Sequence, residues 1–154
     1  MRKSKTAEIE EQPGYFIRRL QQIAVALFLE ETQRHGITPV QFAALSAALR
    51  KPGLDQRTLA STIGLDTSTI GGVIDRLERR GLIERQASPT DRRVRLLHVT
   101  TAGAALLDGV IPDMLKAQLR ILAPLPPADR TKFLSMLKTV VEANNGLSRA
   151  PSES

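Results

Sequence analysis

The sequence contains no cysteine and only two histidines, His35 and His98. The missing thiols exclude a disulfide framework, a thiolate metal site and a cysteine peroxide switch. Two histidines so far apart do not suggest a zinc cluster. A glycine-rich phosphate loop and a histidine with an obvious serine or carboxylate partner are also missing. We therefore expect no metal, no cofactor and no enzymatic activity, and we expect His35, near a helix end, to be structural rather than a sensor.

Aromatic residues are scarce: the chain has no tryptophan, one tyrosine and four phenylalanines. None of these aromatic residues lies between Leu54 and Thr101. Proteins that bind single strands or RNA stack bases on exposed aromatic side chains. If the chain binds nucleic acid, the scarcity of aromatics favours a duplex.

Long apolar runs are missing as well, and none approaches the length that spans a membrane. The charged start, Met1 to Lys5, is not followed by the unbroken apolar segment of a secretion signal. We expect a cytoplasmic protein with no membrane partner.

What the sequence does have is positive charge, with a formal net charge of +6 and a pI of about 10.3. Lys and Arg are attracted to phosphates and release counterions when they bind them. The charge favours a polyanionic partner, although a merely soluble surface also carries charge. At 154 residues the chain is expected to form one domain with a real core.

Apolar residues recur with helical spacing, and these stretches are bounded by capping side chains, glycine or proline. The predicted helices are 15–35, 39–51, 56–63, 67–80, 101–122 and 129–144. Thr38, Asp55 and Asp66 are the expected caps of the second to fourth helices, and Thr100 or Thr101 caps the fifth, which Gly109 and Pro112 are expected to kink. Residues 1–13 are predicted to be a flexible arm, 14–145 a single domain and 146–154 a disordered tail.

The stretch from Leu54 to Thr101 is the most informative. In the helix that follows Asp66, one face carries Ile70, Val73, Ile74 and Leu77, and the opposite face carries Ser68, Gly72, Asp75 and Arg79. Strand-like runs at 83–86 and 94–99 flank a turn-rich loop with Asp91-Arg92-Arg93. The predicted fold is mainly α with a small β wing, a winged helix-turn-helix over about 38–100 of the kind that binds duplex DNA.

These motifs together resemble the multiple antibiotic resistance regulator (MarR) family. The resemblance is carried, in order, by Leu59-Ala60, Leu65-Asp66-Thr67-Ser68-Thr69, Leu77-Glu78-Arg79-Arg80-Gly81-Leu82-Ile83-Glu84-Arg85, Asp91-Arg92-Arg93 and Val99-Thr100-Thr101-Ala102-Gly103. It implies a homodimer formed through N- and C-terminal dimerisation helices, about 15–35 and 101–145. It further implies a regulator, usually a repressor, that binds a pseudo-palindromic operator and is released by a small, often aromatic, acid.

The resemblance also implies that Arg93 is the wing arginine that enters a minor groove, with Asp91 orienting it. Arg92 and Arg95 are candidate phosphate contacts, with a solvated face as the alternative. Gln56 and Arg57 open the helix that crosses the DNA backbone. Gln56 is equally well explained as an ordinary solvated residue.

In the recognition helix, Thr67, Ser68 and Thr69 meet phosphates or base edges, unless they serve only to cap the helix. Arg76 either contacts a guanine or a phosphate or pairs with Asp75 or Glu78. Many members of the family carry larger polar residues at one or both of the positions of Gly71 and Gly72. A glycine pair in a helix suggests close approach to DNA, with Gly72 as the contact, or to another helix.

For the effector, the resemblance points to residues of the first two helices: Tyr15, Arg18, Arg19, Gln22 and Phe42. An arginine beside an aromatic ring suits a planar carboxylate, although dimer contacts or solvation explain the same residues. A winged-helix protein-interaction module with only non-specific DNA binding is the alternative function.

Overall fold

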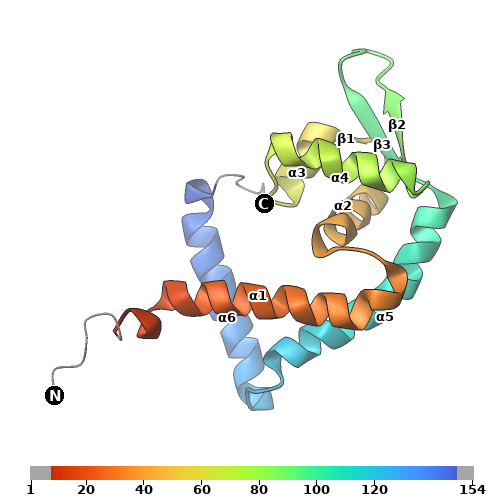
Figure 1. Ribbon diagram of the computed structural model, residues 1–154. Coiled ribbons are helices and arrows are strands. Elements are labelled where there is room, and N and C mark those ends of the chain that lie inside the picture. The colour runs from red at the N-terminus through yellow and green to blue at the C-terminus, as the bar shows by residue number, and fades with distance from the viewer. Residues whose placement is uncertain (1–7, 149–154) are drawn as a thin grey trace, which may run out of the picture.

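The computed structural model describes residues 8–148, which form six α-helices and a small antiparallel sheet at one end of the molecule (Figure 1). The helices are α1 (Pro13–Thr32), α2 (Pro39–Arg50), α3 (Gln56–Thr62), α4 (Thr67–Arg79), α5 (Thr101–Leu122) and α6 (Pro127–Asn144). The strands are β1 (Leu54–Asp55), β2 (Ile83–Ala87) and β3 (Arg95–Val99). Short 3-10 turns are η1 (Ile9–Glu11), η2 (Gln33–His35) and η3 (Asn145–Leu147). The mainly α fold with a β wing is confirmed.

Four helices begin at the capping side chains that the sequence predicts. Thr38 Oγ1 accepts a hydrogen bond from the Gln41 backbone at 3.2 Å, and the Gln41 side chain accepts from the Thr38 backbone. Asp55, Asp66 and Thr100 accept from the N–H three residues later at 3.0, 2.8 and 3.1 Å. Each cap satisfies N–H groups that have no partner inside the helix.

The prolines correct several predicted boundaries. Pro13 is the first residue of α1, so the helix begins inside the predicted arm, and Pro127 opens α6 two residues before Asp129. Proline suits the first turn because its missing N–H would have no helical partner there. Helix α5 continues through Pro112, and η3 includes the first residues of the predicted tail. The rest of the predicted arm and tail, residues 1–7 and 149–154, lies outside the described residues.

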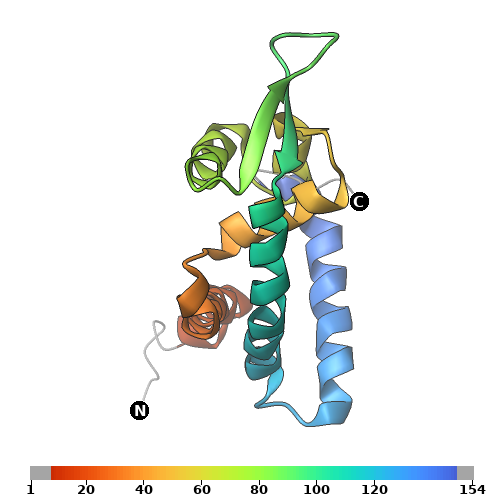
Figure 2. The same ribbon diagram turned by 90° about the vertical axis from the view of Figure 1, so that its right-hand side faces the viewer.

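The sheet has the order β1-β3-β2, with β3 in the centre and both pairings antiparallel. Ile83 pairs with Val99 and Ala87 with Arg95, which forms the predicted hairpin with slightly shifted ends. The sequence analysis missed β1, in which Leu54 pairs with Leu97. A two-residue strand is too short to show an alternating pattern. The hairpin projects well beyond the helices (Figure 2).

One core joins the helix-turn-helix to the sheet. Ile70, Val73, Ile74 and Leu77 of α4 are all buried, as their shared face predicts. They belong to the same cluster as Leu45 of α2, Leu59 of α3 and Leu97 of β3. Burial of this face leaves the opposite face of α4 on the outside of the molecule, on the side of the wing (Figure 1).

Helices α1 and α5 add Phe28, Leu107 and Val110 to the same core, whereas α6 adds no buried residue. Helices α1 and α5 pack on each other, whereas α6 leaves α5 at their connection and has no buried residue (Figure 1). No helix within residues 8–148 combines the length and apolar character needed to cross a membrane.

The wing is joined to α5 without a linker, because only Thr100 separates β3 from the helix. The Thr100 hydroxyl donates to the Gly81 carbonyl at 2.6 Å, and its N–H donates to the Leu82 carbonyl at 3.1 Å. Gly103 lies so close that a Cβ there would be 2.1 Å from the Leu82 carbonyl oxygen and 2.8 Å from Val99 Cγ1. The start of α5 is therefore in direct contact with the base of the wing.

This contact predicts opposite effects of alanine at two helical glycines. Gly103→Ala should lower the free energy of unfolding by about 1–3 kcal/mol, because the new methyl group overlaps backbone atoms. Gly72→Ala is the matched control, since a Cβ there meets nothing within 4 Å, and it should raise stability by up to about 1 kcal/mol. Urea unfolding at one protein concentration measures both. Similar effects of the two substitutions would contradict the predicted close contact.

Candidate DNA-binding site

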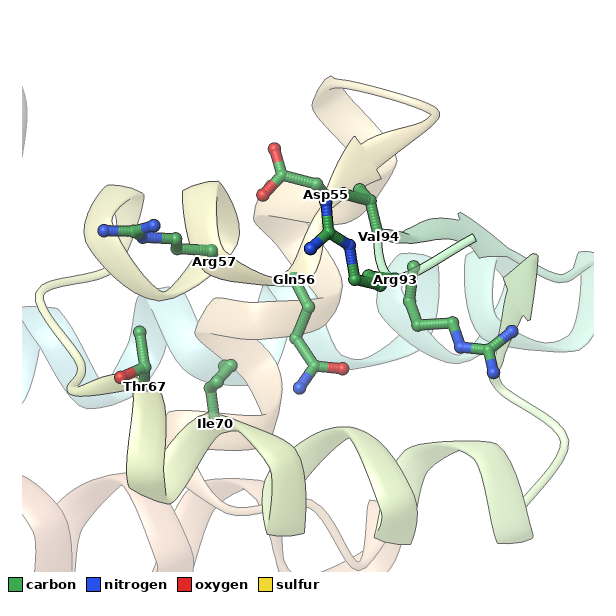
Figure 3. Close-up of a pocket in the computed structure, with 8 residues that line it drawn as sticks. Asp55, Gln56, Arg57, Thr67, Ile70, Arg93 and Val94 are labelled. Atoms are coloured by element: carbon green, nitrogen blue, oxygen red, sulfur yellow. The ribbon is translucent and has the colours of Figure 1, made fainter. Parts of the chain in front are cut away.

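A hollow of about 500 Å³ lies between α3, α4 and the wing (Figure 3). Asp55, Gln56 and Arg57 line it from the start of α3, Thr67 and Ile70 from α4, and Arg93, Val94 and Arg95 from the wing. Half of the predicted DNA-binding residues are thereby brought together: Gln56, Arg57, Thr67, Arg93 and Arg95. The α3 cap at Asp55 and the α4 cap at Asp66 place the beginnings of both helices at this hollow.

The other predicted contacts on α4 lie on its outward side. Ser68, Thr69, Gly72 and Arg76 are all exposed. The Ser68 hydroxyl donates to Asp66 Oδ1 at 2.6 Å, so this side chain takes part in the cap. Thr69 donates its backbone N–H to the same oxygen at 2.8 Å, and its side chain stays exposed. Thus the capping alternative accounts for Ser68, whereas a DNA contact of the exposed Thr69 side chain stays a prediction.

Most arginines around the hollow have no ionic partner within residues 8–148. This holds for Arg57, Arg76, Arg92 and Arg95, all of which are exposed. Arg76 does not pair with Asp75 or Glu78, which was one of its two predicted roles. Unpaired guanidinium groups on a shared surface produce a positive potential that attracts phosphates.

Arg93 is held by its own loop. Its backbone N–H and its Nε both donate to Asp91 Oδ1, at 3.0 and 3.2 Å, while 91% of its side chain remains exposed. The loop is closed by a hydrogen bond from Ser88 N–H to the Val94 carbonyl at 3.0 Å. This is the contact that the orienting role of Asp91 requires. A short loop with these internal bonds presents the guanidinium at the end of the wing.

Arg85 is a central residue that the sequence analysis did not select. From β2 it donates to Asp75 Oδ1 at 2.5 Å, to the Gly71 carbonyl at 3.1 Å and to Gln56 Oε1 at 3.1 Å. Glu78 Oε1 lies 3.6 Å from the same guanidinium. One side chain therefore connects the wing, the recognition helix and α3. The available signal was a charged residue two positions after the buried Ile83, where a strand alternates back to the inward side.

Arg85 also changes the electrostatics of the site. Asp75 and Glu78 lie on the half of α4 that faces away from the core, and their carboxylates would repel DNA phosphates. Arg85 pairs closely with Asp75 and lies 3.6 Å from Glu78, so its single positive charge offsets part of this negative charge. The negative charge of α4 is thus partly balanced by a residue of β2.

The glycine pair in α4 is not required by packing within the described chain. A Cβ at Gly71 would lie 3.7 Å from Gln56 Nε2, which is ordinary contact, and a Cβ at Gly72 would meet nothing within 4 Å. The alternative of close approach to another helix therefore finds no support here. Gly72 as a DNA contact stays a prediction.

The predicted effector residues form two groups. Tyr15 packs against Phe16, with ring centroids 5.5 Å apart, and Arg18 lies over the Tyr15 ring at 5.6 Å. Arg19 donates to Gln22 at 3.3 Å on the same helix. Phe42 instead packs against Phe28, at 5.8 Å between centroids. Since Phe28 lies 13 residues beyond Tyr15, about 20 Å along α1 at 1.5 Å per residue, one chain does not unite these residues in one pocket.

Comparison with known proteins places this geometry in a family. A sequence model of the MarR family matches residues 37–94. The putative transcriptional regulatory protein for the hcr operon of Thauera aromatica is 35% identical over 126 residues, covering 81% of this chain and 76% of that protein.

Two solved structures are similar over most of their length. The transcriptional repressor CouR, bound to a 23-mer DNA duplex, has a TM-score of 0.82 and 32% identity, covering 90% of this chain and 99% of CouR. Bordetella bronchiseptica BpsR, whose DNA binding is regulated by 6-hydroxynicotinic acid, has a TM-score of 0.80 and 29% identity, covering 85% of this chain and 94% of BpsR. With its helix-turn-helix, arginine-tipped wing and flanking helices, the chain belongs to the MarR family of winged-helix transcriptional regulators.

Proposed function

We propose that the protein is a homodimeric, sequence-specific transcriptional repressor that binds a pseudo-palindromic operator. The observation that carries this proposal is the group of exposed arginines, Arg57, Arg93 and Arg95, that line the hollow between α3, α4 and the wing. A DNA phosphate backbone that passes between the recognition helix and the wing would lie in this hollow. The similarity to CouR, which was solved on a DNA duplex, supports the same use of this surface.

The proposed contacts divide into positioning and recognition. Arg57, Arg92 and Arg95 bind phosphates, which orients the protein without reading sequence. The outward side of α4, from Thr67 to Arg76, enters the major groove and meets base edges. Arg93 enters the adjacent minor groove, where a narrow A·T-rich segment concentrates negative potential.

The proposal of a dimer rests on apolar side chains that one chain leaves exposed. In α6, Leu134, Met136, Val140 and Val141 are 52–63% exposed. A hollow of about 440 Å³ between α1, α5 and α6 is lined by apolar residues such as Ile17, Ile121 and Phe133. Apolar surface of this extent is typical of an interface rather than of a free monomer. A second copy that covers these helices would present two winged helices to one duplex.

We further propose that a small aromatic acid releases the operator, as 6-hydroxynicotinic acid regulates DNA binding by BpsR. On α1, Tyr15, Arg18, Arg19 and Gln22 offer an aromatic ring and cationic groups, and Phe42 supplies a second ring from α2. Because the α1 group and Phe42 are far apart in one chain, a pocket that uses both requires the α1 of the second copy. Binding there changes the spacing of the two recognition helices, so that both no longer fit successive major grooves.

The function is tested by first selecting duplexes that bind the purified protein from a random pool. The affinity for the selected duplex is then compared with that for a scrambled duplex at several salt concentrations. We expect tight binding to the selected duplex only. Arg93→Ala should lower that affinity and reduce the salt dependence by about one phosphate equivalent. Lys132→Ala, which removes one charge near the start of α6 at the far end from the wing, should leave both unchanged. Weak binding that is equal on both duplexes would instead favour a protein-interaction module.

Arg85 provides a test of how the recognition surface is held together. Arg85→Ala should lower operator affinity by about tenfold or more, because it frees two carboxylates toward the phosphates and disconnects α4 from β2. Arg85→Lys retains the charge but cannot satisfy Gln56, Gly71 and Asp75 together, so it should restore only part of the affinity. Fluorescence anisotropy on the selected duplex measures both variants. Full affinity in Arg85→Ala would show that the contacts of Arg85 with Asp75, Gly71 and Gln56 have no role in binding.

Effector release is tested with a panel of aromatic acids that includes 6-hydroxynicotinate and benzoate. At least one should weaken operator binding, while cyclohexanecarboxylate, with the same charge and no aromatic ring, should have little effect. Arg18→Ala should abolish the response without changing DNA affinity in the absence of acid. Equal operator affinity with and without saturating concentrations of every acid would contradict the proposal.

A further inference from the structure

The turn at the end of α1 receives a side chain from the recognition helix. Arg80, which directly follows α4, donates from Nη1 to the Gly36 carbonyl at 2.7 Å and from Nη2 to the His35 carbonyl at 3.2 Å. Gly36 has a φ of +61°, in the left-handed region that strongly favours glycine. This conformation ends η2 and places two successive carbonyls within reach of one planar guanidinium. The fixed fork of an arginine makes such a paired contact directional.

The same turn is tied to the middle of α5 from its other side. His35 Nε2 and Arg34 Nη2 each lie 2.9 Å from Asp113 Oδ2, and Lys116 Nζ lies 3.2 Å from Oδ1. Asp113 is only 5% exposed. Its hydrogen bonds, first with His35 and then with Lys116, lower the pKa of its carboxyl group to about 2, so the carboxylate is ionised at neutral pH. A Cβ at Gly109 would lie 3.3 Å from His35 Cε1, so a glycine there lets the ring approach α5 closely.

The corner that follows α4 is consequently attached to α5 at two separate points. The first is the hydrogen bond of 2.6 Å from Thr100, at the start of α5, to the Gly81 carbonyl. The second runs from Arg80 through the η2 turn to Asp113, more than three helical turns further along α5. A single contact point leaves the orientation of one helix relative to another adjustable, whereas two separate contact points fix it. Without the second, the C-terminal corner of α4 is attached to α5 only through Thr100 and its neighbours, and the angle between α4 and α5 is less closely fixed.

Arg80 differs in this respect from the neighbouring arginines of α4. Arg76 and Arg79 are exposed and have no partner within residues 8–148, so they are available to phosphates. The guanidinium of Arg80 is already occupied by two carbonyls of its own chain. Its guanidinium is therefore directed at the η2 turn, whereas those of Arg76 and Arg79 are not engaged within residues 8–148.

We propose that Arg80 is a positioning residue that fixes the separation of the two recognition helices in the dimer, by coupling α4 to the α1–α5 pair through the η2 turn. The inference rests on the proposed function as a dimer that binds two half-sites. Its specific consequence is that Arg80 controls how strictly the protein measures half-site spacing. It does not determine which bases are recognised.

The experiment uses the full-length protein and the duplex that wild type selects from a random pool, together with two derivatives whose central spacer is one base pair longer or shorter. Each added base pair rotates one half-site relative to the other and shifts it by about 3.4 Å. Wild type should bind the altered spacers at least about tenfold more weakly, equivalent to about 1.4 kcal/mol. In Arg80→Gln this ratio should fall to within about threefold, equivalent to about 0.7 kcal/mol.

Two further variants separate positioning from charge and from folding. Arg79→Gln removes the same charge one residue away, so it should weaken binding to all three duplexes alike and keep the wild-type ratio. Arg80→Lys retains the charge but loses the two-pronged contact, so it should also relax the ratio, and it serves in place of Arg80→Gln if that variant does not fold. Thermal unfolding and light scattering of each variant check that the folded dimer persists.

The outcomes are distinct. A relaxed spacing ratio in the Arg80 variants, with the wild-type ratio in Arg79→Gln, supports the proposal. A uniform loss of affinity in the Arg80 variants, with the ratio intact, would overturn it and leave Arg80 a structural or phosphate-binding residue. If wild type selects no sequence at all, the proposed regulator function fails, and that failure is recognised before any Arg80 variant is tested.

Discussion

The proposed DNA-binding surface depends on one side chain, the Arg85 guanidinium, which pairs with Asp75 and donates to Gly71 and Gln56. Hydrophobic packing seats α4 on the core through Ile70 and Ile74, but an apolar face tolerates small rotations and slides that a hydrogen-bonded fork does not. The same guanidinium offsets part of the negative charge of two carboxylates on α4. Arg85, a β2 residue outside the helix-turn-helix, therefore influences both the position of α4 and the charge of this surface.

The two parts of the molecule are stabilised in different ways. The helix-turn-helix and the sheet enclose a core whose members, such as Leu45 and Leu97, are fully buried within one chain. Helix α6 has no buried residue in the chain by itself, so its stability must come from apolar area covered by another surface. The proposed DNA-binding lobe is therefore stabilised within one chain, whereas α6 depends on a surface outside it.

The sequence predicted what depends on neighbouring residues. The caps at Thr38, Asp55 and Asp66 and the buried face of α4 follow from short-range chemistry and helical spacing, and all are confirmed. Prolines were ambiguous because Pro-rich segments mark a break and the first turn of a helix equally well, so α1 and α6 were predicted to begin too late. Strand β1, the Arg85 clamp and the separation of Phe42 from Tyr15 depend on which segments meet in three dimensions. The strand alternation in β2 indicates only that Arg85 points inward, and local patterns do not give the partners that these residues meet.

The direct junction between wing and α5 has a mechanical consequence. With Thr100 as the only residue between them, and Gly103 against the Leu82 carbonyl, the base of the hairpin and the start of α5 are directly coupled. Helix α5 has 22 residues and is about 33 Å long, so a rotation of five degrees at one end displaces the other by about 3 Å. That displacement is comparable to the rise of one base pair. A small tilt of α5 would therefore move the attached wing by about the rise of one base pair.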